Sequence, residues 1–480
     1  MERTRSRPPL IFGLGESVAD YLVIGGVLTL SLAVPQARAG LMAALAFGAL
    51  VSPSLALRAL ALTWMMTVLN PGIVGEGLAG GSLRYAVIFS VFAAALFRGI
   101  WTSRGLVPRL VVSTIAFPAY AALAAVVVSY AVDISLLKVA SYCVGVIGML
   151  WSVYLLDDSP RFERWLFRLV VVIVFASFPL IVSGVGYFRN GSGFQGILTH
   201  PQFYGAFLGV VLSWLFVLRF VEHDRSRLLL ATIVVGSISL IATEARVGVA
   251  ALIGSVTFVA LFFAPSGAQR SRARNTFLVT TTVILLLLII FPAVGEAIYQ
   301  FAIKEGRGNP QDIAESLEQS RGQLIFTSFM NFLDHPMLGI GFGLPSDPAR
   351  MVVQYDPVLG LPASVPVEKG FIVTALLEET GIIGTALFIL FMIAIIRRAL
   401  WSRRSALIAL AFAVPLSNVA EVTMFSLGGN GLFFWVLLSF AAYSARAAHG
   451  AEPDQARDAQ HAAGDPARDA AAPVAPPDPA

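Results

Sequence analysis

The sequence predicts an all-α protein: a polytopic transmembrane bundle of about 14 helices (range 12–14) with one large external loop that contains short helices. Hydrophobic residues make up 57% and charged residues only 13% of the 480 positions, and the mean hydropathy is +0.79. Soluble domains carry about 25% charge. Many apolar runs approach the ~20 residues that cross a ~30 Å hydrocarbon core. The ~10-residue alternation of membrane strands is not seen, so helices are expected.

The positive charge and the single cysteine exclude several classes of site. The net charge is +4, but the excess arginine falls in short loops between apolar runs, where membrane topology explains it. No nucleic-acid partner is therefore expected. Cys143 is the only cysteine, which excludes an intrachain disulfide and a cysteine metal cluster. No metal and no cofactor are expected.

The first apolar segment covers about 18–34 and follows a basic start. A retained helix is favoured over a cleaved signal peptide, because the run is longer than a typical signal core. Further spans are expected near 39–51, 54–70, 84–101, 110–131, 135–156, 166–186, 202–220, 228–243, 247–264, 276–292, 371–395, 405–424 and 430–445.

Alternate loops between these spans are rich in arginine, which sets the predicted orientation. The basic loops hold Arg98/Arg104/Arg109, Arg161/Arg164/Arg168, Arg219/Arg225/Arg227, Arg270/Arg272/Arg274 and Arg397/Arg398/Arg403/Arg404. Basic loops face the cytoplasm, so both termini are expected there. The chain then divides into helices 1–11 (1–292), an external loop (293–368), helices 12–14 (369–446) and a tail (447–480) that lacks aromatic residues and is expected to be disordered.

The external loop holds an amphipathic run from Asp312 to Asp334 that contains Arg321. Its apolar residues recur at helical spacing, so the helix would lie on the membrane surface or close the bundle. Arg321 lies close to this stripe and either snorkels to lipid headgroups or serves a site. His335-Pro336 should end the helix.

Three glycines follow in alternation: Gly339, Gly341 and Gly343. Glycines let backbone N–H groups approach an anion closely. A tight re-entrant turn explains the same pattern equally well.

Three further stretches carry polar residues at the external side. Arg246 lies between two spans, where it either pairs with Glu244 or Glu421 or binds a phosphate with two parallel hydrogen bonds. The run 189–202 holds Arg189 and His200. Glu368-Lys369 leads into Glu378-Glu379, of which at least one carboxylate should face the bundle, protonated or paired with an arginine.

In order and spacing, these stretches resemble the O-antigen ligase/polymerase superfamily of bacterial membrane proteins, over about 180–395. The elements are Gly196…His200-Pro201-Gln202, Glu244-Ala245-Arg246-Val247-Gly248, Arg321-Gly322…His335-Pro336-Met337-Leu338-Gly339-Ile340-Gly341-Phe342-Gly343 and Leu377-Glu378-Glu379-Thr380-Gly381-Ile382-Ile383-Gly384. No single element is specific, and the four in sequence are fairly specific.

The resemblance implies a metal-independent glycosyltransferase of the bacterial inner membrane, acting at the periplasmic face. Its donor would be a glycan on undecaprenyl pyrophosphate, and Arg246 and Arg321 would hold the pyrophosphate. Fixed cations suit a leaving group that carries several negative charges. Arg189, His200, His335, Gly339, Gly341 and Lys369 would contact the substrate. A flippase and a chain-length regulator of the same pathway would be partners.

One departure bears on the activity. Ligases of the family carry a His-Asn pair where this chain reads Gly370-Phe371. Glu368 is the nearest group to activate an acceptor hydroxyl, with His200 and His335 as alternatives. The missing pair favours polymerisation of lipid-linked repeat units over ligation of a finished glycan. A flippase or secondary transporter is the third reading, although no repeated halves are evident.

Overall fold

The computed structural model describes residues 14–34, 36–74, 82–101, 109–188, 193–263, 321–355, 362–364, 367 and 369–443. The expected span near 276–292, the first part of the amphipathic run and the tail 447–480 lie outside these residues.

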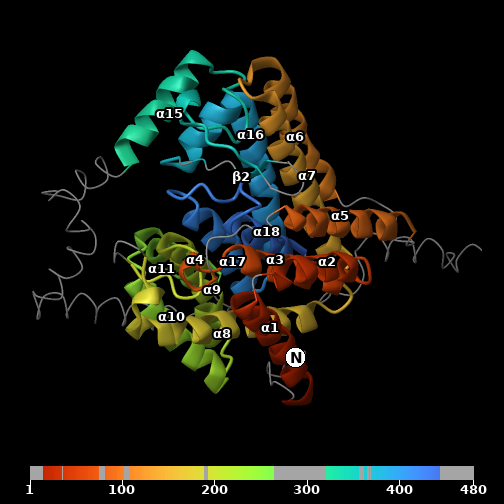
Figure 1. The fold of residues 1–480 in the computed structure, drawn as a ribbon, viewed down its shortest axis with the longest axis vertical. Helices are drawn as coiled ribbons and strands as arrows, with labels where there is room; N and C mark the ends of the chain where they lie inside the picture. The colour runs from red at the N-terminus through yellow and green to blue at the C-terminus, as the bar shows by residue number, and fades with distance from the viewer. Residues whose placement is uncertain are drawn as a thin grey trace, which may run out of the picture.

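Within the described residues the fold is almost entirely helical (Figure 1). The α-helices are α1 (Leu14–Ala33), α2 (Ala37–Ala49), α3 (Pro53–Thr67), α4 (Pro71–Val74), α5 (Leu83–Trp101), α6 (Arg109–Val128), α7 (Val132–Tyr154), α8 (Ser159–Ser177), α9 (Pro201–Phe216), α10 (Arg227–Ala242), α11 (Arg246–Phe262), α15 (Gln323–Asp334), α16 (Ile372–Trp401), α17 (Ser405–Ser417) and α18 (Asn430–Tyr443). The shorter elements are η1 (Phe178–Val182), η2 (Gly184–Gly186), η3 (Val217–Val221), η5 (Pro348–Arg350), and the antiparallel pair β1 (Gln354–Tyr355) and β2 (Pro362–Ser364).

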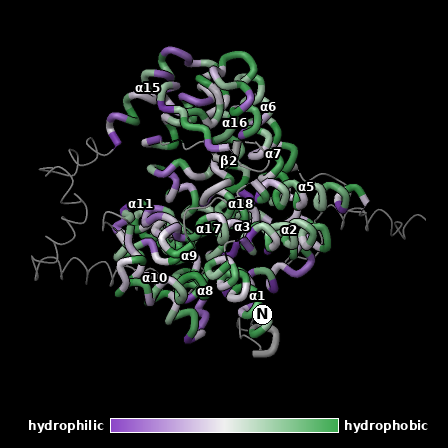
Figure 2. Tube along the Cα trace, viewed as in Figure 1, coloured by the Kyte–Doolittle hydropathy of each residue, from purple (hydrophilic) through white to green (hydrophobic). Residues whose placement is uncertain are grey.

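The helices confirm an all-α membrane protein. Among the described residues six helices are long and apolar enough to cross a bilayer: Leu83–Trp101, Leu110–Val128, Val132–Tyr154, Ser159–Val182, Pro201–Val221 and Ile372–Trp401. Six shorter apolar helices accompany them. Hydrophobic residues run along most of the helices in Figure 2. The expected total of about 14 spans stays a prediction.

The helices α9 and α11 pack closely through small residues. A Cβ added to Gly209 would lie 2.3 Å from the carbonyl oxygen of Gly248, and one added to Gly205 would lie 2.1 Å from the Cβ of Ala245. Helices in lipid gain stability from such close approach, because apolar burial alone does not drive them together. The start of α11, with Arg246, is thereby fixed against α9.

One end of the bundle gathers the basic loops, and we call it the basic end, marked by Arg98, Arg168 and Arg404. Arg404 donates to both carboxylate oxygens of Glu163, at 2.8 and 2.6 Å. Arg98 donates to the carbonyl of Leu50, and Arg168 pairs with an aspartate of α1. Burial alone would lower the pKa of Arg404, but the neighbouring carboxylates raise it on balance. The described parts of the loops around Arg98, Arg168 and Arg404 therefore gather at one end; their assignment to the cytoplasm stays a prediction.

The opposite end holds α15, which Figure 1 places at one extremity of the molecule, with α1 at the other. The helix ends at His335, as the His-Pro pair predicted. It keeps Ser328 buried and turns Phe326 and Leu333 outward, 61% and 51% exposed. An apolar outer face is what a helix in contact with lipid requires.

The long helix α16 is broken at Gly381, where φ is 63° and ψ is −172°. The predicted span near 371–395 gave no sign of this break. The N–H of Ile340 donates to the carbonyl of Glu378 at 2.8 Å, and the N–H of Ile382 donates to the carbonyl of Pro336 at 2.9 Å. The re-entrant segment 336–343 therefore satisfies backbone groups that the break leaves open. Irregular backbone inside a membrane protein needs such partners.

We predict that Gly381→Ala destabilises the fold. A Cβ at this position would lie 2.0 Å from the carbonyl oxygen of Met337, and the backbone conformation, which is open almost only to glycine, costs about 1–3 kcal/mol for a residue with a Cβ. Thermal unfolding of the purified protein in detergent should show a clearly lower midpoint. Gly25→Ala is the matched control, because nothing lies within 4 Å of its added Cβ. Equal midpoints for the two variants would contradict the described break.

Candidate functional site

Arg321 lies in the turn that precedes α15 and is held by two contacts. Its Nη2 pairs with the Glu421 carboxylate, in the loop between α17 and α18, and its Nη1 donates to the carbonyl of Lys369 at 3.3 Å. The side chain is 21% exposed. An arginine offers more N–H donors than these two contacts use. The structure therefore presents a fixed, partly accessible guanidinium group, and not one extended toward headgroups.

Glu421, one of the two carboxylates predicted as a partner for Arg246, pairs with Arg321; the partner of Arg246 stays a prediction. A single carboxylate beside the guanidinium compensates its charge and sets its orientation.

Lys369 links this arginine to a buried ion pair. Its Nζ lies 2.5 Å from Oε2 of Glu378, and the two side chains are 1% and 0% exposed. Nζ also donates to Oγ of Ser346 at 3.1 Å. A substrate could contact Lys369 only if this ion pair opened. We therefore assign Lys369 a structural role and leave it out of the proposed substrate site.

Glu378 is the centre of the polar network. Asn331 of α15 donates to its Oε1 at 2.6 Å and to the carbonyl of Ser346 at 2.8 Å. Ser346 donates to Oε2 of Glu378 at 3.2 Å. The network therefore ties α15, the segment after the re-entrant turn and the first part of α16 together.

Glu379 is also buried and receives the N–H of Gly343 at 2.7 Å. On the other side of this glycine, Lys138 of α7 donates to the Gly343 carbonyl at 2.5 Å. Glu378 and Glu379 thus both face the bundle interior, where the sequence predicted that at least one of them would. The cation paired with Glu378 is a lysine and not an arginine.

Tyr130 closes the network from the loop between α6 and α7. Its hydroxyl donates to the carbonyl of Pro345 at 2.9 Å. Burial, followed by the carboxylates of Glu378 and Glu379, raises the pKa of Tyr130 to about 12. The phenol therefore stays protonated, and remains a donor, throughout the physiological range.

The alternating glycines form the re-entrant turn and not an open anion cradle. Gly339 and Gly341 have φ values of 70° and 112°. The N–H of Gly339 donates to the carbonyl of His335 at 2.9 Å, and that of Gly341 to the carbonyl of Glu379 at 3.2 Å. The third glycine of the turn, Gly343, donates its N–H to the carboxylate of Glu379 and not to a bound anion. The N–H groups of Gly339 and Gly341 are already bonded within the protein, so we leave them out of the proposed substrate site.

The two candidate histidines have different surroundings. His200 caps α9, because its Nδ1 accepts the N–H of Gln202 at 3.1 Å, and its ring packs edge-on against Phe188 with centroids 4.7 Å apart. His335 is exposed at the end of α15. Arg189 and Glu368 lie outside the described residues.

Arg246 is half-buried at the first position of α11. This helix runs antiparallel to α17: Ser405 at the start of α17 donates to the carbonyl of Phe263 at 2.8 Å, and Leu416 near its end lies against Gly254. The start of α11 is therefore at the end of α17, from which the chain continues to Glu421. Arg246 and Arg321 lie at the same end of the bundle.

The four sequence elements form two bonded pairs, and one further segment contacts both pairs. The N–H of Phe194 donates to the carbonyl of Ala242 at 2.8 Å, which joins the first element to the second. The third and fourth are joined at the break in α16. The segment 418–430 connects the pairs, because Glu421 binds Arg321 and Asn430 donates to the carbonyl of Phe203 at 3.0 Å.

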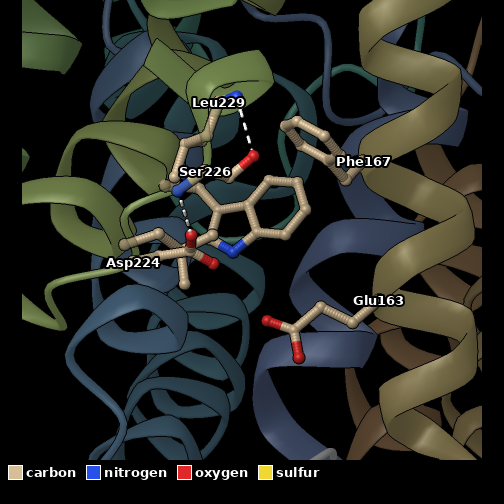
Figure 3. A pocket seen from close by; sticks show the side chains of 7 residues that line it. Glu163, Phe167, Asp224, Ser226 and Leu229 are labelled. Atoms are coloured by element: carbon tan, nitrogen blue, oxygen red, sulfur yellow. Dashed lines mark hydrogen bonds between the residues drawn. The ribbon is translucent and has the colours of Figure 1, made fainter. Parts of the chain in front are cut away.

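Two cavities in the described part of the chain lie at the basic end, away from this site. The smaller, shown in Figure 3 between Glu163, Phe167, Asp224, Ser226 and Leu229, has a volume of about 10 Å³. That volume holds one water molecule at most. The larger, of about 320 Å³, lies between α3 and α8.

Sequence analysis did not identify Asn331 and Ser346 as members of this network. Each is a single polar residue whose partner is distant in sequence, so no local pattern marks it.

Searches with the sequence find no matching protein-family model and no matching curated protein.

We predict that Lys369→Met destabilises the protein by about 3–5 kcal/mol, because it leaves the Glu378 carboxylate buried without its cation. The double variant Lys369→Met/Glu378→Gln should recover most of the loss, since two neutral side chains of similar size need no counter-charge. Unfolding in detergent, followed by intrinsic fluorescence, measures both.

The control is Arg350→Gln, which removes an exposed ion pair with Asp347 whose side chains are 81% and 48% exposed. Surface pairs of this kind contribute about 0–1 kcal/mol. A single variant at position 369 no less stable than this control, or a double variant less stable than the single one, would contradict the buried pair.

Proposed function

We propose that the chain is a membrane glycosyltransferase that polymerises lipid-linked oligosaccharide repeat units carried on a polyprenyl pyrophosphate. The observation that carries the proposal is the fixed, partly accessible guanidinium of Arg321, held by Glu421 and by the carbonyl of Lys369. The proposal includes a bacterial inner-membrane location with the Arg321 end of the bundle outside the cytoplasm.

The chemistry requires cations that do not move as charge develops. When the glycosidic bond breaks, the diphosphate leaves with an additional negative charge, and preorganised donors stabilise it most effectively. Arg321 is held by Glu421 and by the carbonyl of Lys369. Arg246, at the start of α11, supplies the second guanidinium in the proposal. Guanidinium groups suit this role because they bind phosphate oxygens in pairs.

The acceptor is a sugar hydroxyl, which a nearby base activates. We assign this role to Glu368, which directly precedes the buried Lys369. The proton of the acceptor hydroxyl passes to the carboxylate as the new glycosidic bond forms, and the diphosphate leaves on its lipid. His200 is less suited, since its Nδ1 already caps α9.

A transporter or flippase for a lipid-linked glycan is the second candidate, and the break in α16 favours it. Discontinuous helices with charged residues beside the break line the substrate sites of many transporters. Here the N–H groups of the re-entrant turn are bonded within the protein, which supports a scaffold role for the break. Ligation of a finished glycan is the third candidate.

The first prediction concerns the glycans that accumulate when the gene for this protein is deleted. A lost polymerase leaves surface glycans of a single repeat, because repeat units still reach the acceptor but are not joined. Mass spectrometry of surface and lipid-linked glycans measures this. Full-length chains retained on the lipid would identify a ligase, and repeat units retained on the cytoplasmic leaflet would identify a flippase; either outcome contradicts polymerisation.

The second prediction concerns the two arginines in the complemented deletion strain. Arg321→Lys and Arg246→Lys should each lower the amount of polymer at least tenfold, since loss of one charge-assisted contact costs about 1.5–3 kcal/mol. Arg350→Lys is the control, because its side chain is 81% exposed. Wild-type polymer from either variant, at equal protein level in the membrane, would remove that arginine from the site.

A further inference from the structure

The larger cavity at the basic end has the composition of a lipid headgroup site. Its volume is about 320 Å³, within the range of small-molecule pockets. The first turns of α3 and α8 form its walls. Its lining residues are Ser52, Pro53, Ser54, Leu55, Arg58, Leu156, Asp157, Asp158 and Arg161.

Arg58 is the principal cation in this cavity. Its Nη1 lies 3.5 Å from Oδ1 of Asp20, and its guanidinium lies over the ring of Trp165, 5.4 Å from the centroid. Asp20 also pairs with Arg168, so one carboxylate serves two arginines. The Nε–H of Arg58 is buried and has no hydrogen-bond partner among the described residues. Because Nε is enclosed, an anion in the cavity would bind the terminal Nη groups, which offer more N–H donors than the contact with Asp20 uses.

Two carboxylates line the same cavity. Asp158 caps α8, because its Oδ1 accepts the N–H of Arg161 at 2.9 Å. A carboxylate has further lone pairs after one such bond. Asp157 lies beside it at the surface. Because the cavity walls carry both cations and carboxylates, a zwitterionic ligand can pair with both. A purely anionic ligand would be repelled by the carboxylates.

The surroundings of the cavity place it at the depth of lipid headgroups. Leu55 lines the cavity and is 40% exposed, and Val51 and Phe47, which precede it in the chain, are 69% and 72% exposed. Trp101 is 85% exposed near Arg98, which donates to the carbonyl of Leu50. Tryptophan and arginine concentrate where the hydrocarbon core meets water. The exposed apolar side chains of Phe47, Val51 and Leu55, at the end of α2 and the start of α3, thus offer a surface for acyl chains beside the polar cavity.

We propose that this cavity binds the headgroup of a phosphoethanolamine phospholipid. The lipid phosphate binds Arg58, the ammonium group donates to Asp158, and the acyl chains follow Leu55, Val51 and Phe47. A phosphocholine headgroup carries the same charges but has no N–H donors, and a phosphoglycerol headgroup has no cation for the carboxylates. Selectivity among these three lipids is therefore the signature of the site, and it does not depend on the glycan chemistry.

The test titrates the purified full chain in detergent with phosphatidylethanolamine, phosphatidylcholine and phosphatidylglycerol of identical acyl chains. Native mass spectrometry measures binding, and thermal unfolding measures stabilisation. We expect phosphatidylethanolamine to bind about tenfold more tightly than the other two, the effect of one charge-assisted hydrogen bond. Asp158→Asn removes the charge but keeps a capping side chain, and it should abolish this preference.

Arg58→Gln should weaken all three lipids about tenfold, since each carries the phosphate. Asp347→Asn is the matched control, because Asp347 caps the short helix η5 through a similar bond, 2.9 Å to Ala349, and the variant should keep the preference. Equal binding of phosphatidylglycerol or phosphatidylcholine to the wild-type chain would overturn the proposal. So would an unchanged preference in Asp158→Asn, which remains informative even if Arg58→Gln fails to fold.

Discussion

The contact between segment 336–343 and the break in α16 holds the Arg321 end of the molecule together. A helix inside a bilayer normally satisfies its own backbone, and a break opens carbonyl and N–H groups that water cannot reach. Here the carbonyls of Glu378 and Glu379 and the N–H of Ile382 find partners in the re-entrant turn. The turn fits because its glycines adopt left-handed conformations with no Cβ to collide with α16. A loop and a span thereby become one rigid unit.

The same unit explains the buried charges. Lys369 and Glu378 are almost completely removed from solvent, an arrangement that is costly unless every charge is paired and every polar atom is bonded. Ser346 and Asn331 supply the remaining bonds, and Asn331 belongs to α15, directly after Arg321 in the chain. The ion pair thus fixes the backbone whose carbonyl receives the Arg321 guanidinium. The proposed ligand site at Arg321, in the turn before α15, thereby depends for its rigidity on this buried network.

The two ends of the bundle divide the polar residues differently. At the basic end, Arg58, Arg98 and Arg404 bind carboxylates or carbonyls close to the expected membrane surface. At the other end, among the described residues, the Lys369–Glu378 pair is buried more deeply than any ion pair of the basic end, with side chains 1% and 0% exposed. This difference fits a protein whose basic end meets headgroups and whose other end carries the specific chemistry.

Much of the fold could be predicted from hydropathy, because each span satisfies its backbone locally. The end of α15 at His335-Pro336 and the turn at Gly339 and Gly341 also follow from local rules. The break at Gly381 could not be foreseen, since a glycine inside an apolar helix is usually tolerated. The pairing of Arg321 with Glu421 joins residues 100 positions apart, and a single sequence holds no signal for such a partner. Lys369 and Glu378 meet only because the chain turns at the start of α16.

The most direct measurement is an experimental structure of the full chain with a bound polyprenyl pyrophosphate. We predict that the diphosphate lies within hydrogen-bonding distance of the Arg321 guanidinium, with Glu421 and the Lys369 carbonyl still holding that side chain. A diphosphate bound at the basic end, or elsewhere with Arg321 remote from it, would contradict the assignment of this arginine and the glycosyltransferase proposal with it.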